Sequence, residues 1–320
     1  MRGLRYMIPM LVMLLFMASC ARRPFADYNS KVKLSLNINT DIQNHEVTKL
    51  PENMRVDLYD PATGEHLYTD YVGPEGGYIH PDPGIYDLIV YSIGSETTIV
   101  HNEHHFNEIE AYTNEVMSYL KSQTAENQTK EGESEHPIVY EPEHIFVGWH
   151  QSLEVPVALE DEEIQEILVE IDAHTIVETW QVEIRNVEGT QYVSELSGIA
   201  CGQRGSVHIG PNVASERVVR VIFEMKLEDK GSGGKCIKGK YSSFGVHEEQ
   251  TGTVYLDLSV GNKGGGSQYF RFDVTDQMKG NEQRYILIDD PVVIEESGGG
   301  GGGFQPIVDD WDDIHTDIKL

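Results

Sequence analysis

The sequence Val-Lys-Leu-Ser-Leu-Asn-Ile-Asn at positions 32–39 alternates apolar with polar residues. A period of two places the apolar side chains on one face of a β-strand and the polar side chains on the other. The same pattern returns at 54–58 and 84–91, and again at 218–227 and 254–260. These segments predict half-buried strands in a β-rich protein.

Turn residues separate the predicted strands. Gly and Pro are concentrated at 61–64, 73–77 and 81–84, where they supply the fixed or positive φ that a chain reversal needs. Apolar residues come near helical spacing only at 106–120, which we predict to be a helix. Many short strands with little helix predict an all-β protein built of antiparallel sandwiches.

The length of 320 residues favours two domains, at roughly 150 residues each. A polar stretch at 121–135 without apolar periodicity reads as a loop or linker. We therefore expect an N-terminal domain over 20–141 and a C-terminal domain over 142–296. Residues 297–320 follow as a Gly-rich tether and tail.

The first nineteen residues read as a secretory signal peptide. Arg2 and Arg5 precede an apolar run at 6–17, which is too short for a span of about 20 residues. The segment ends in Ala18-Ser19-Cys20, and small residues before a cysteine are typical of a lipidation site. We predict removal of 1–19 and acylation of Cys20, which would anchor the chain in a membrane.

Acidic residues dominate the composition. Without 1–19 the chain has 22 basic and 53 acidic residues, a formal charge of −31. Such a charge repels nucleic-acid backbones, so we expect no nucleic-acid partner.

Two further cysteines, Cys201 and Cys236, form an even pair in a compartment that permits disulfides. A bond between them would close a loop of about 36 residues and could contribute on the order of 4 kcal/mol. The sequence leaves open whether the bond forms, because it does not give the separation of the two Cα atoms.

The C-terminal segment begins with six glycines at 298–303, a flexible tether. The tail beyond it can pair as a strand, because alternate residues near its end are apolar. The residues of this candidate donor strand are Trp311, Ile314, Thr316, Ile318 and Leu320. Two readings stay open: the tail adds to a sheet edge of a partner, or it folds back as the last strand of the second domain.

Catalytic signatures are incomplete in this sequence. Residues 234–240 match the start of a phosphate-binding loop, but Tyr241 stands where Ser or Thr would hold magnesium. The histidines at 101–105 lack the spacing of a helical zinc motif and read as a polar strand or loop. We predict a protein without catalytic residues, bound metal or cofactor.

Several segments in order along the mature chain resemble the fimbrillin-associated, FimB-like lipoproteins of Bacteroides-type bacteria. They are Cys20 to Pro24, Pro83 to Tyr91, Leu196 to Ile199, Phe272 to Gln277, Leu287 to Pro291, and the tail with Phe304, Pro306, Trp311 and Ile314. The resemblance implies two tandem transthyretin-like sandwiches on the outer membrane. It also implies fimbrillin-like partners and a role as anchor, cap or minor subunit of fimbriae.

Arg22 and Arg23 directly follow the predicted lipidation site. Cleavage there would release the anchor, although we favour its retention.

A different class of function is capture of a carbohydrate or another host or bacterial surface ligand. In that reading, exposed Trp149, Trp180 and Tyr192 would form a stacking platform.

Overall fold

The fold was analysed in a computed structural model, which describes residues 31–116, 136–157, 166–230, 234–247 and 253–296. The predicted signal peptide, Cys20, the stretch at 121–135 and the tail lie outside these residues. The all-β prediction is confirmed, since almost all regular structure is strand. Among the described helices, none is long and apolar enough to cross a membrane.

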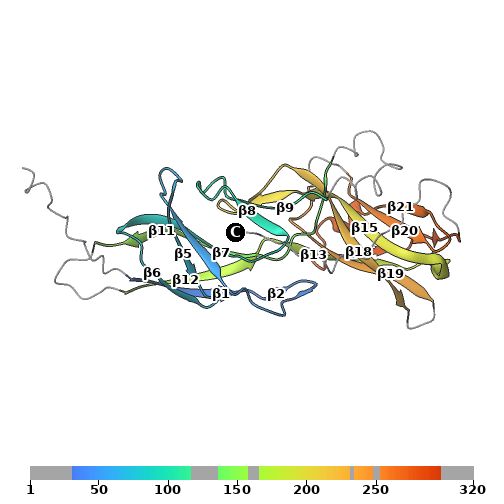
Figure 1. The fold of residues 1–320 in the computed structure, drawn as a ribbon, viewed down its shortest axis with the longest axis horizontal. Helices are drawn as coiled ribbons and strands as arrows, with labels where there is room; N and C mark the ends of the chain where they lie inside the picture. Colours follow the sequence, from blue (N-terminus) through green and yellow to red (C-terminus); the bar gives the residue numbers. More distant parts are fainter. Residues whose placement is uncertain (1–30, 117–135, 158–165, 231–233, 248–252, 297–320) are drawn as a thin grey trace, which may run out of the picture.

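A seven-stranded sheet forms one half of the elongated molecule (Figure 1). Its strands are β1 (Lys31–Ile38), β4 (Met54–Tyr59), β5 (His66–Val72), β6 (Gly76–Ile79), β7 (Gly84–Ser92), β11 (Phe146–Val155) and β12 (Glu166–Thr175). The order is β5-β4-β7-β11-β12-β1-β6, and β11 meets β12 through two residue pairs only. The sheet therefore folds into two layers around one core, which we call the first sandwich.

The alternation predicted for the first strand is confirmed. Val32 and Leu34 are buried in the core of the first sandwich, whereas Lys33 and Asn37 are exposed. Burial of the apolar face drives this arrangement, because each buried aliphatic side chain contributes about 1.5–3 kcal/mol.

A second sheet, with the order β21-β20-β15-β18-β19-β13-β22, encloses another core and forms the second sandwich. Its strands are β13 (Glu178–Ile184), β15 (Val193–Arg204), β18 (Val218–Asp229), β19 (Lys235–Ser243), β20 (Tyr255–Asn262), β21 (Ser267–Asp273) and β22 (Tyr285–Ile288). Strand β10 (Ile138–Val139) joins this sheet by pairing with β18. The long β18 serves both layers, because its first half pairs with β15 and its second half with β19.

A third sheet contains strands from both halves of the chain. It comprises β8 (Thr98–His101), β9 (Glu110–Thr113), β16 (Ser206–His208) and β17 (Val213–Ala214). Strand β9 pairs with β16, and the sheet packs on the outer face of β4, β7 and β11. The core beneath it, which we call the junction core, joins side chains of both halves, such as Tyr91 and Ile209.

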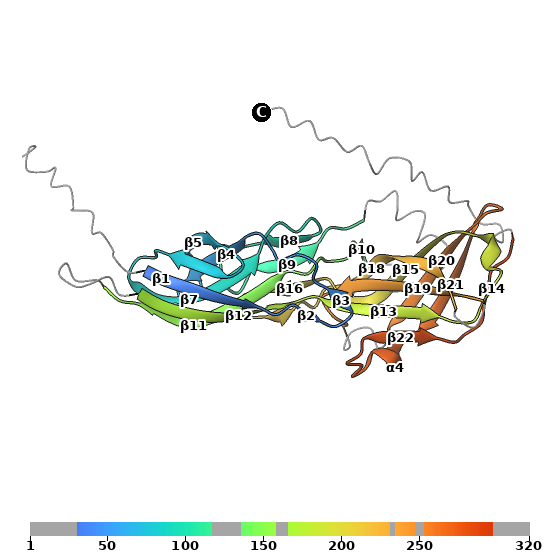
Figure 2. The same ribbon diagram turned by 90° about the horizontal axis from the view of Figure 1, so that it is seen from below.

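Short elements complete the fold. They are the hairpin of β2 (Asp41–Ile42) and β3 (His45–Glu46), the pair of β14 (Val187–Glu188) and β23 (Val292–Val293), the 3-10 turn η1 (Thr190–Tyr192) and the helix α4 (Thr275–Met278). In Figure 2, β1 lies near one end of the molecule and β14 near the other. The described chain therefore begins at one end and, through β23, finishes at the opposite end.

Two local predictions are corrected by the structure. No helix forms in the described part of 106–120, because Ile109, Ala111 and Thr113 are buried at alternate positions and the segment pairs with β16. The sheets are also mixed rather than purely antiparallel: β1 runs parallel to β12, and β22 runs parallel to β13. Partners so distant in sequence leave no hairpin signal that a local pattern could reveal.

The expected boundary at residue 142 does not coincide with a change of sheet. Strands β11 and β12 come after it, yet both belong to the first sandwich, which therefore extends to Thr175. Strand β10 comes before it, yet pairs with the second sheet. The chain thus crosses between the two sandwiches more than once.

Candidate functional site at the junction

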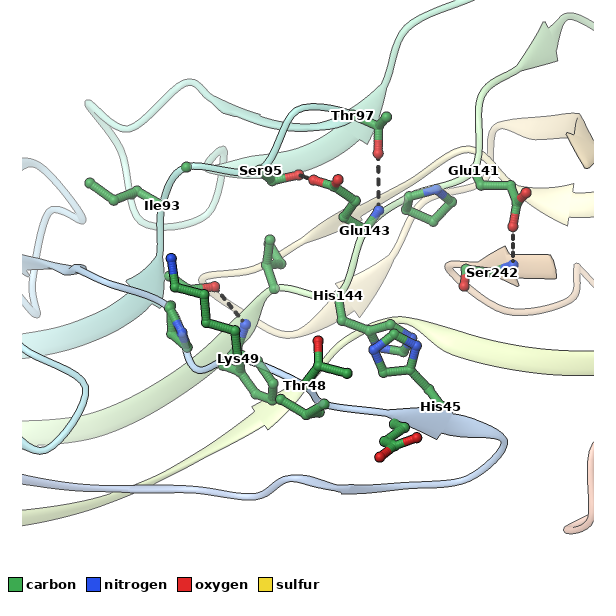
Figure 3. Close-up of a pocket in the computed structure, with 18 residues that line it drawn as sticks. His45, Thr48, Lys49, Ile93, Ser95, Thr97, Glu141, Glu143, His144 and Ser242 are labelled. Atoms are coloured by element: carbon green, nitrogen blue, oxygen red, sulfur yellow. Dashed lines mark hydrogen bonds between the residues drawn. The ribbon is translucent and has the colours of Figure 1, made fainter. Parts of the chain in front are cut away.

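A pocket of about 550 Å³ opens where the two sandwiches meet (Figure 3). Three segments contribute most of its lining: the residues from β3 to Pro51, the segment 92–97 that follows β7, and the segment 141–146 that leads into β11. Ser242 of β19 adds a contact from the second sandwich. Clefts of this size are common at domain junctions, so this pocket is the candidate site.

Two histidine rings are in contact on one wall of the pocket, with an angle of 34° between their planes. The rings of His45 and His144 have centroids 4.1 Å apart. Both ring nitrogens of His144 lie 2.8 Å from threonine hydroxyls, those of Thr175 and Thr179. Burial, then the proximity of His45 and Arg284, lowers the pKa of His144 to about 4. His144 is therefore neutral near pH 7, and its two nitrogens are already used in hydrogen bonds.

Two carboxylates flank Pro142 and take the place of main-chain acceptors. Glu141 accepts a hydrogen bond of 2.9 Å from the Ser242 amide of β19. Glu143 accepts bonds from the Ser95 hydroxyl and from the amide of residue 96. Burial raises the pKa of Glu141 to about 7. The segment 141–143 is thus connected to β19 and to residues 95–96 by hydrogen bonds of its side chains, outside the regular strand pairing.

The tip of the β2–β3 hairpin fastens the first sandwich to the second. Asn44 has a left-handed backbone, with φ of 64°, which suits a tight turn. Its side-chain amide nitrogen lies 3.0 Å from the carbonyl oxygens of Gln283 and Arg284 and 3.2 Å from that of Thr179. In return, Lys240 of β19 donates to the Asn44 carbonyl at 3.1 Å. These bonds place His45 against His144.

Glu141 also lines a second pocket of about 420 Å³, which runs over β13, β18 and β19. Two of its three lysines form local ion pairs, Lys226 with Glu224 and Lys238 with Glu228, both at 3.2 Å, and the third, Lys240, donates to the Asn44 carbonyl. The described residues contain no group of three side chains that could hold a metal ion. The polar side chains at the junction mainly connect neighbouring segments. The imidazole of His144 is neutral, and Glu141 and Glu143 accept hydrogen bonds from main-chain amides.

The disulfide that the sequence left open is not formed in this structure, where Cys201 and Cys236 are both buried free thiols. Ala200, the neighbour of Cys201, lies opposite Val221 of β18. Cys236 lies opposite Glu228, seven residues further along the same strand. At about 3.3 Å per residue the two cysteines are roughly 23 Å apart, far beyond the Cα separation of a disulfide. The register of the second sheet therefore excludes the bond.

The aromatic platform considered from the sequence does not exist as a surface. Trp180 is buried in the core of the second sandwich, and Tyr192 packs against that core. Trp149 is half-buried against the junction core and donates its indole N–H to the Ile209 carbonyl at 2.7 Å. The other predicted site residues, Cys20 and the tail residues from Trp311 to Leu320, lie outside the described residues.

Sequence reasoning missed a buried charge cluster between the first and third sheets. Asp57 is fully buried, lies 3.0 Å from the guanidinium of Arg55, and accepts hydrogen bonds from Thr69 and Tyr91. Alternation placed Asp57 on the polar face of β4, which the third sheet covers. The only sequence signal was the alternation of Arg55, Asp57 and Tyr59 on one face of β4, and Tyr91 of β7 joins them only in the folded protein.

Comparisons with known proteins find a family to which this chain is similar and several similar proteins from Bacteroides. A family described as "Domain of unknown function (DUF5119)" matches residues 19–224. Fim4B of Bacteroides ovatus, named as a candidate fimbrium anchoring subunit, is 25% identical over 232 residues, which cover 72% of this chain and 63% of that protein. The match thus spans less than two thirds of the length of this relative.

Two crystal structures of candidate adhesins from Bacteroides ovatus have the same fold. One is 20% identical, with a TM-score of 0.54, and the match covers 85% of this chain and 97% of that one. The other is 9% identical, with a TM-score of 0.50 and coverage of 84% and 91%. At these identities the likeness shows the fold alone. The resemblance to fimbrium-associated proteins that the sequence motifs indicated is confirmed by the family match and by Fim4B.

Proposed function

The chain belongs to the DUF5119 family, and from this membership and its fold we propose that it is an outer-membrane lipoprotein associated with fimbriae, as an anchor, cap or minor subunit. Its role is structural and adhesive, without catalysis. Its partners are fimbrillin-like subunits, as the name of Fim4B suggests for that relative.

The proposed lipid anchor is Cys20. The family match starts at residue 19, and β1 begins at Lys31, eleven residues after the cysteine. Acyl chains on Cys20 would therefore hold the outer end of the first sandwich close to the membrane. The body would then stand on the cell surface with the second sandwich pointing away.

Two transthyretin-like sandwiches in tandem are the architecture that we propose for this role. Each half has a seven-stranded path that folds around its own core. The third sheet, the hairpin tip at Asn44 and the junction core connect the halves. A connected pair suits a protein that transmits load between a membrane and a fibre.

The observation that carries the proposal is that the first and last strands of the described chain, β1 and β23, lie at opposite ends of the molecule (Figure 2). The last described strand, β23, pairs with β14 at the end remote from β1. The 24 residues that follow Glu296 include the candidate donor strand at 314–320. We propose that this strand adds to a sheet edge of a partner, where main-chain hydrogen bonds fix its register.

Two measurements test the proposal. Mass spectrometry of the mature protein should find acyl groups on residue 20, and an unmodified cysteine there would refute the lipid anchor. Deletion of 310–320 should leave a folded protein that no longer associates with fimbriae. Normal association of the deleted form would refute the donor role, and loss of folding would show that the tail completes the second sandwich.

A further inference from the structure

Exposed apolar side chains gather at the outer end of the first sandwich, the end remote from the second sandwich. Tyr78, Ile85, Val157 and Leu168 are 46% to 67% exposed. We call these four residues the end patch. A single exposed apolar side chain is ordinary, but a group of them in one region is typical of a surface that another molecule covers.

Strand pairing places the four residues at the same end. Lys31, where β1 begins, lies opposite Glu166, the first residue of β12, and Ile79 at the end of β6 lies opposite Val32. In the other layer the start of β7 lies opposite the end of β11. Strands β11 and β12 pair only where β11 begins and β12 ends, on the side of the junction. The end patch is therefore at the end of the molecule from which β1 starts (Figure 2).

The core of the protein does not account for this exposure. In β12 the outward positions are otherwise polar, as at Glu166 and Glu170, and Leu168 stands between these two. In β7, Ile89 is covered by the third sheet, whereas Ile85, on the same face and four residues earlier, is exposed. These side chains are thus available to a partner outside the described chain.

Two lysines of β1 accompany the end patch. Lys33 lies opposite Tyr78 on one side and opposite Leu168 on the other. Its ammonium is 5.8 Å from the centroid of the Tyr78 ring and 4.0 Å from the Glu166 carboxylate. The Tyr78 hydroxyl donates to the same carboxylate at 2.9 Å. The charge of Glu166 is thus balanced locally, and Lys31, the neighbouring outward residue of β1, adds a second cation.

This combination of groups suits the headgroup region of a phospholipid membrane. Tyrosine is enriched at membrane–water interfaces, where its ring contacts apolar chains and its hydroxyl stays in the polar layer. Lysine stems lie along apolar surface while the ammonium reaches polar groups such as lipid phosphates. The chain as a whole is strongly acidic, so the match is to zwitterionic rather than anionic lipids.

The depth of the end patch also fits a membrane interface. Leu168 is two residues from the start of β12, which corresponds to roughly 7 Å at about 3.3 Å per residue. Tyr78 precedes the last residue of β6, Ile85 is the second residue of β7, and Val157 lies two residues beyond β11. Elements that lie in a membrane interface bury their apolar face by about 5–10 Å. A molecule standing on this end would therefore bring the whole end patch to that depth.

The proposed anchor keeps this end near the membrane. Residues 21–30 separate Cys20 from Lys31, and at about 3.3–3.6 Å per residue such a segment spans at most roughly 40 Å. A tether of this length raises the effective concentration of the end patch at the lipid surface, so contacts that are weak by themselves become significant. The position beside the tether favours lipid over a protein partner.

We propose that the end patch inserts into the headgroup region of the phospholipid membrane that holds the lipid anchor. The inference rests on the anchor proposed at Cys20 and adds to it a direct contact between the folded body and lipid. Two attachments fix the direction of the long axis, whereas a tether alone leaves it free. The second sandwich then points away from the membrane.

Quenching by brominated lipids tests the contact. The mature chain, residues 20–320, is coupled through Cys20 to a maleimide phospholipid in phosphatidylcholine vesicles, and Cys201 and Cys236 do not compete because they are buried. Leu168→Trp places an indole in the end patch. When the acyl chains carry bromine, the fluorescence that this substitution adds to that of the wild type should fall by about half or more, because bromine quenches only an indole at the depth of the lipid.

Val293→Trp is the matched control, since Val293 is 51% exposed on β23 at the opposite end of the molecule. The fluorescence that it adds should change by less than about a tenth. Absence of quenching in Leu168→Trp would overturn the inference and leave the end patch to a protein partner. Equal quenching in both variants would also overturn it, because the molecule would then lie along the membrane.

Charged substitutions test the same contact from another position. Ile85→Trp becomes the fluorophore, and Tyr78→Glu with Leu168→Glu is added to it. We expect the quenching of Ile85→Trp to fall by about threefold or more, because carboxylates oppose insertion into lipid. Val213→Glu with Val293→Glu, exposed on other sheets, should change the quenching by less than about a fifth. Equal losses with the two pairs would contradict the choice of the end patch.

The anchor and the contact fail separately, because the maleimide lipid supplies the tether whether or not residue 20 is acylated in the cell. If residue 20 carries acyl groups but Leu168→Trp is not quenched, the anchor stands and the contact is wrong. If residue 20 is unmodified, the proposed anchor is refuted, and quenching in the coupled protein still decides whether the end patch binds lipid.

Discussion

At the scale of single residues, Glu141 is the clearest source of pH dependence at the junction. Burial raises the pKa of its carboxyl from 4.5 to about 7, so the folded state favours the protonated form. Stability associated with this group is present at low pH and is lost as the pH rises from about 4.5 to 7. Glu141→Gln removes the ionisation and keeps an oxygen that can accept the Ser242 amide bond.

We expect Glu141→Gln to raise the free energy of unfolding at pH 8 by on the order of 1–3 kcal/mol. Urea denaturation at several pH values measures the difference. At pH 4.5 or below the two proteins should be nearly equal, since the carboxyl is then protonated in the folded wild type. A difference that does not change with pH would contradict the proposed cause.

His144 should show the opposite slope. Its pKa falls from 6.5 to about 4 in the folded state, mainly because the ring is buried, so the folded state favours neutral imidazole. Stability from this group is complete above about pH 6.5 and is lost as the pH falls toward 4. The ring is partly accessible, so we expect a loss of only about 1–2 kcal/mol over this interval.

In His144→Gln the free energy of unfolding should depend less on pH between 6.5 and 4, because glutamine does not titrate. The variant will be less stable than the wild type at pH 7, since one amide does not replace both threonine bonds. The gap between the two proteins should narrow as the pH falls from 7 to 4. If the difference in free energy of unfolding between the two proteins instead grows as the pH falls, protonation of His144 does not cause the loss of stability in acid.

At the scale of elements, much of the strand pattern could be predicted from the sequence. Alternation located β1, β4 and β7, because a half-buried strand imposes its period of two on the residues. The helix predicted at 106–120 was wrong: the spacing of Ile109 and Tyr112 fits a helix, but residues 110–112 pair with β16 and form a strand. Contacts between distant segments override local periodicity, and they also created the parallel pairings that the sequence did not show.

The candidate site was largely invisible to sequence reasoning for the same reason. His45, His144 and Ser242 come from three distant segments that only the fold brings together. No short motif connects them, and each looks like an ordinary surface residue by itself. The sequence left open whether Cys201 and Cys236 bond, because proximity in a sheet depends on register, which spacing in the sequence does not reveal.

The β2–β3 hairpin offers a test of how one small element contributes to the junction. Asn44→Ala removes the contacts of the side-chain amide with three carbonyl oxygens of the second sandwich, and alanine tolerates the left-handed φ of 64° less well than asparagine. Asn44→Gly removes the same bonds but adopts this φ without strain. We expect losses of about 1–3 kcal/mol for Ala and a smaller loss for Gly.

Chemical denaturation of both variants measures the hairpin's contribution, and the difference between Ala and Gly isolates the backbone term. Hydrogen exchange adds a local readout: amide protons of β3 should exchange faster in either variant, because the tip is no longer fastened. If neither variant changes the exchange of the hairpin, the bonds of Asn44 do not hold it in place.

At the scale of the whole molecule, we expect the junction core to decide whether the two sandwiches unfold together. Ile209 and Ile286 are both fully buried isoleucines, but Ile209 belongs to the junction core and Ile286 to the core of the second sandwich. Truncating either to alanine should cost about 2–5 kcal/mol. The two variants nevertheless remove different things: the first weakens the coupling between sandwiches, and the second weakens one sandwich.

Calorimetry distinguishes these effects through the ratio of the calorimetric to the van't Hoff enthalpy, which is close to one for a single cooperative transition. We expect the wild type and Ile286→Ala to unfold in one transition, because the third sheet and the junction core still bind the halves. In Ile209→Ala the transition should broaden or divide, and the ratio should rise above one. One sharp transition in Ile209→Ala would mean that the paired strands β9 and β16, rather than the junction core, couple the two sandwiches. Two transitions in the wild type would show that the sandwiches unfold independently, with only weak coupling between them.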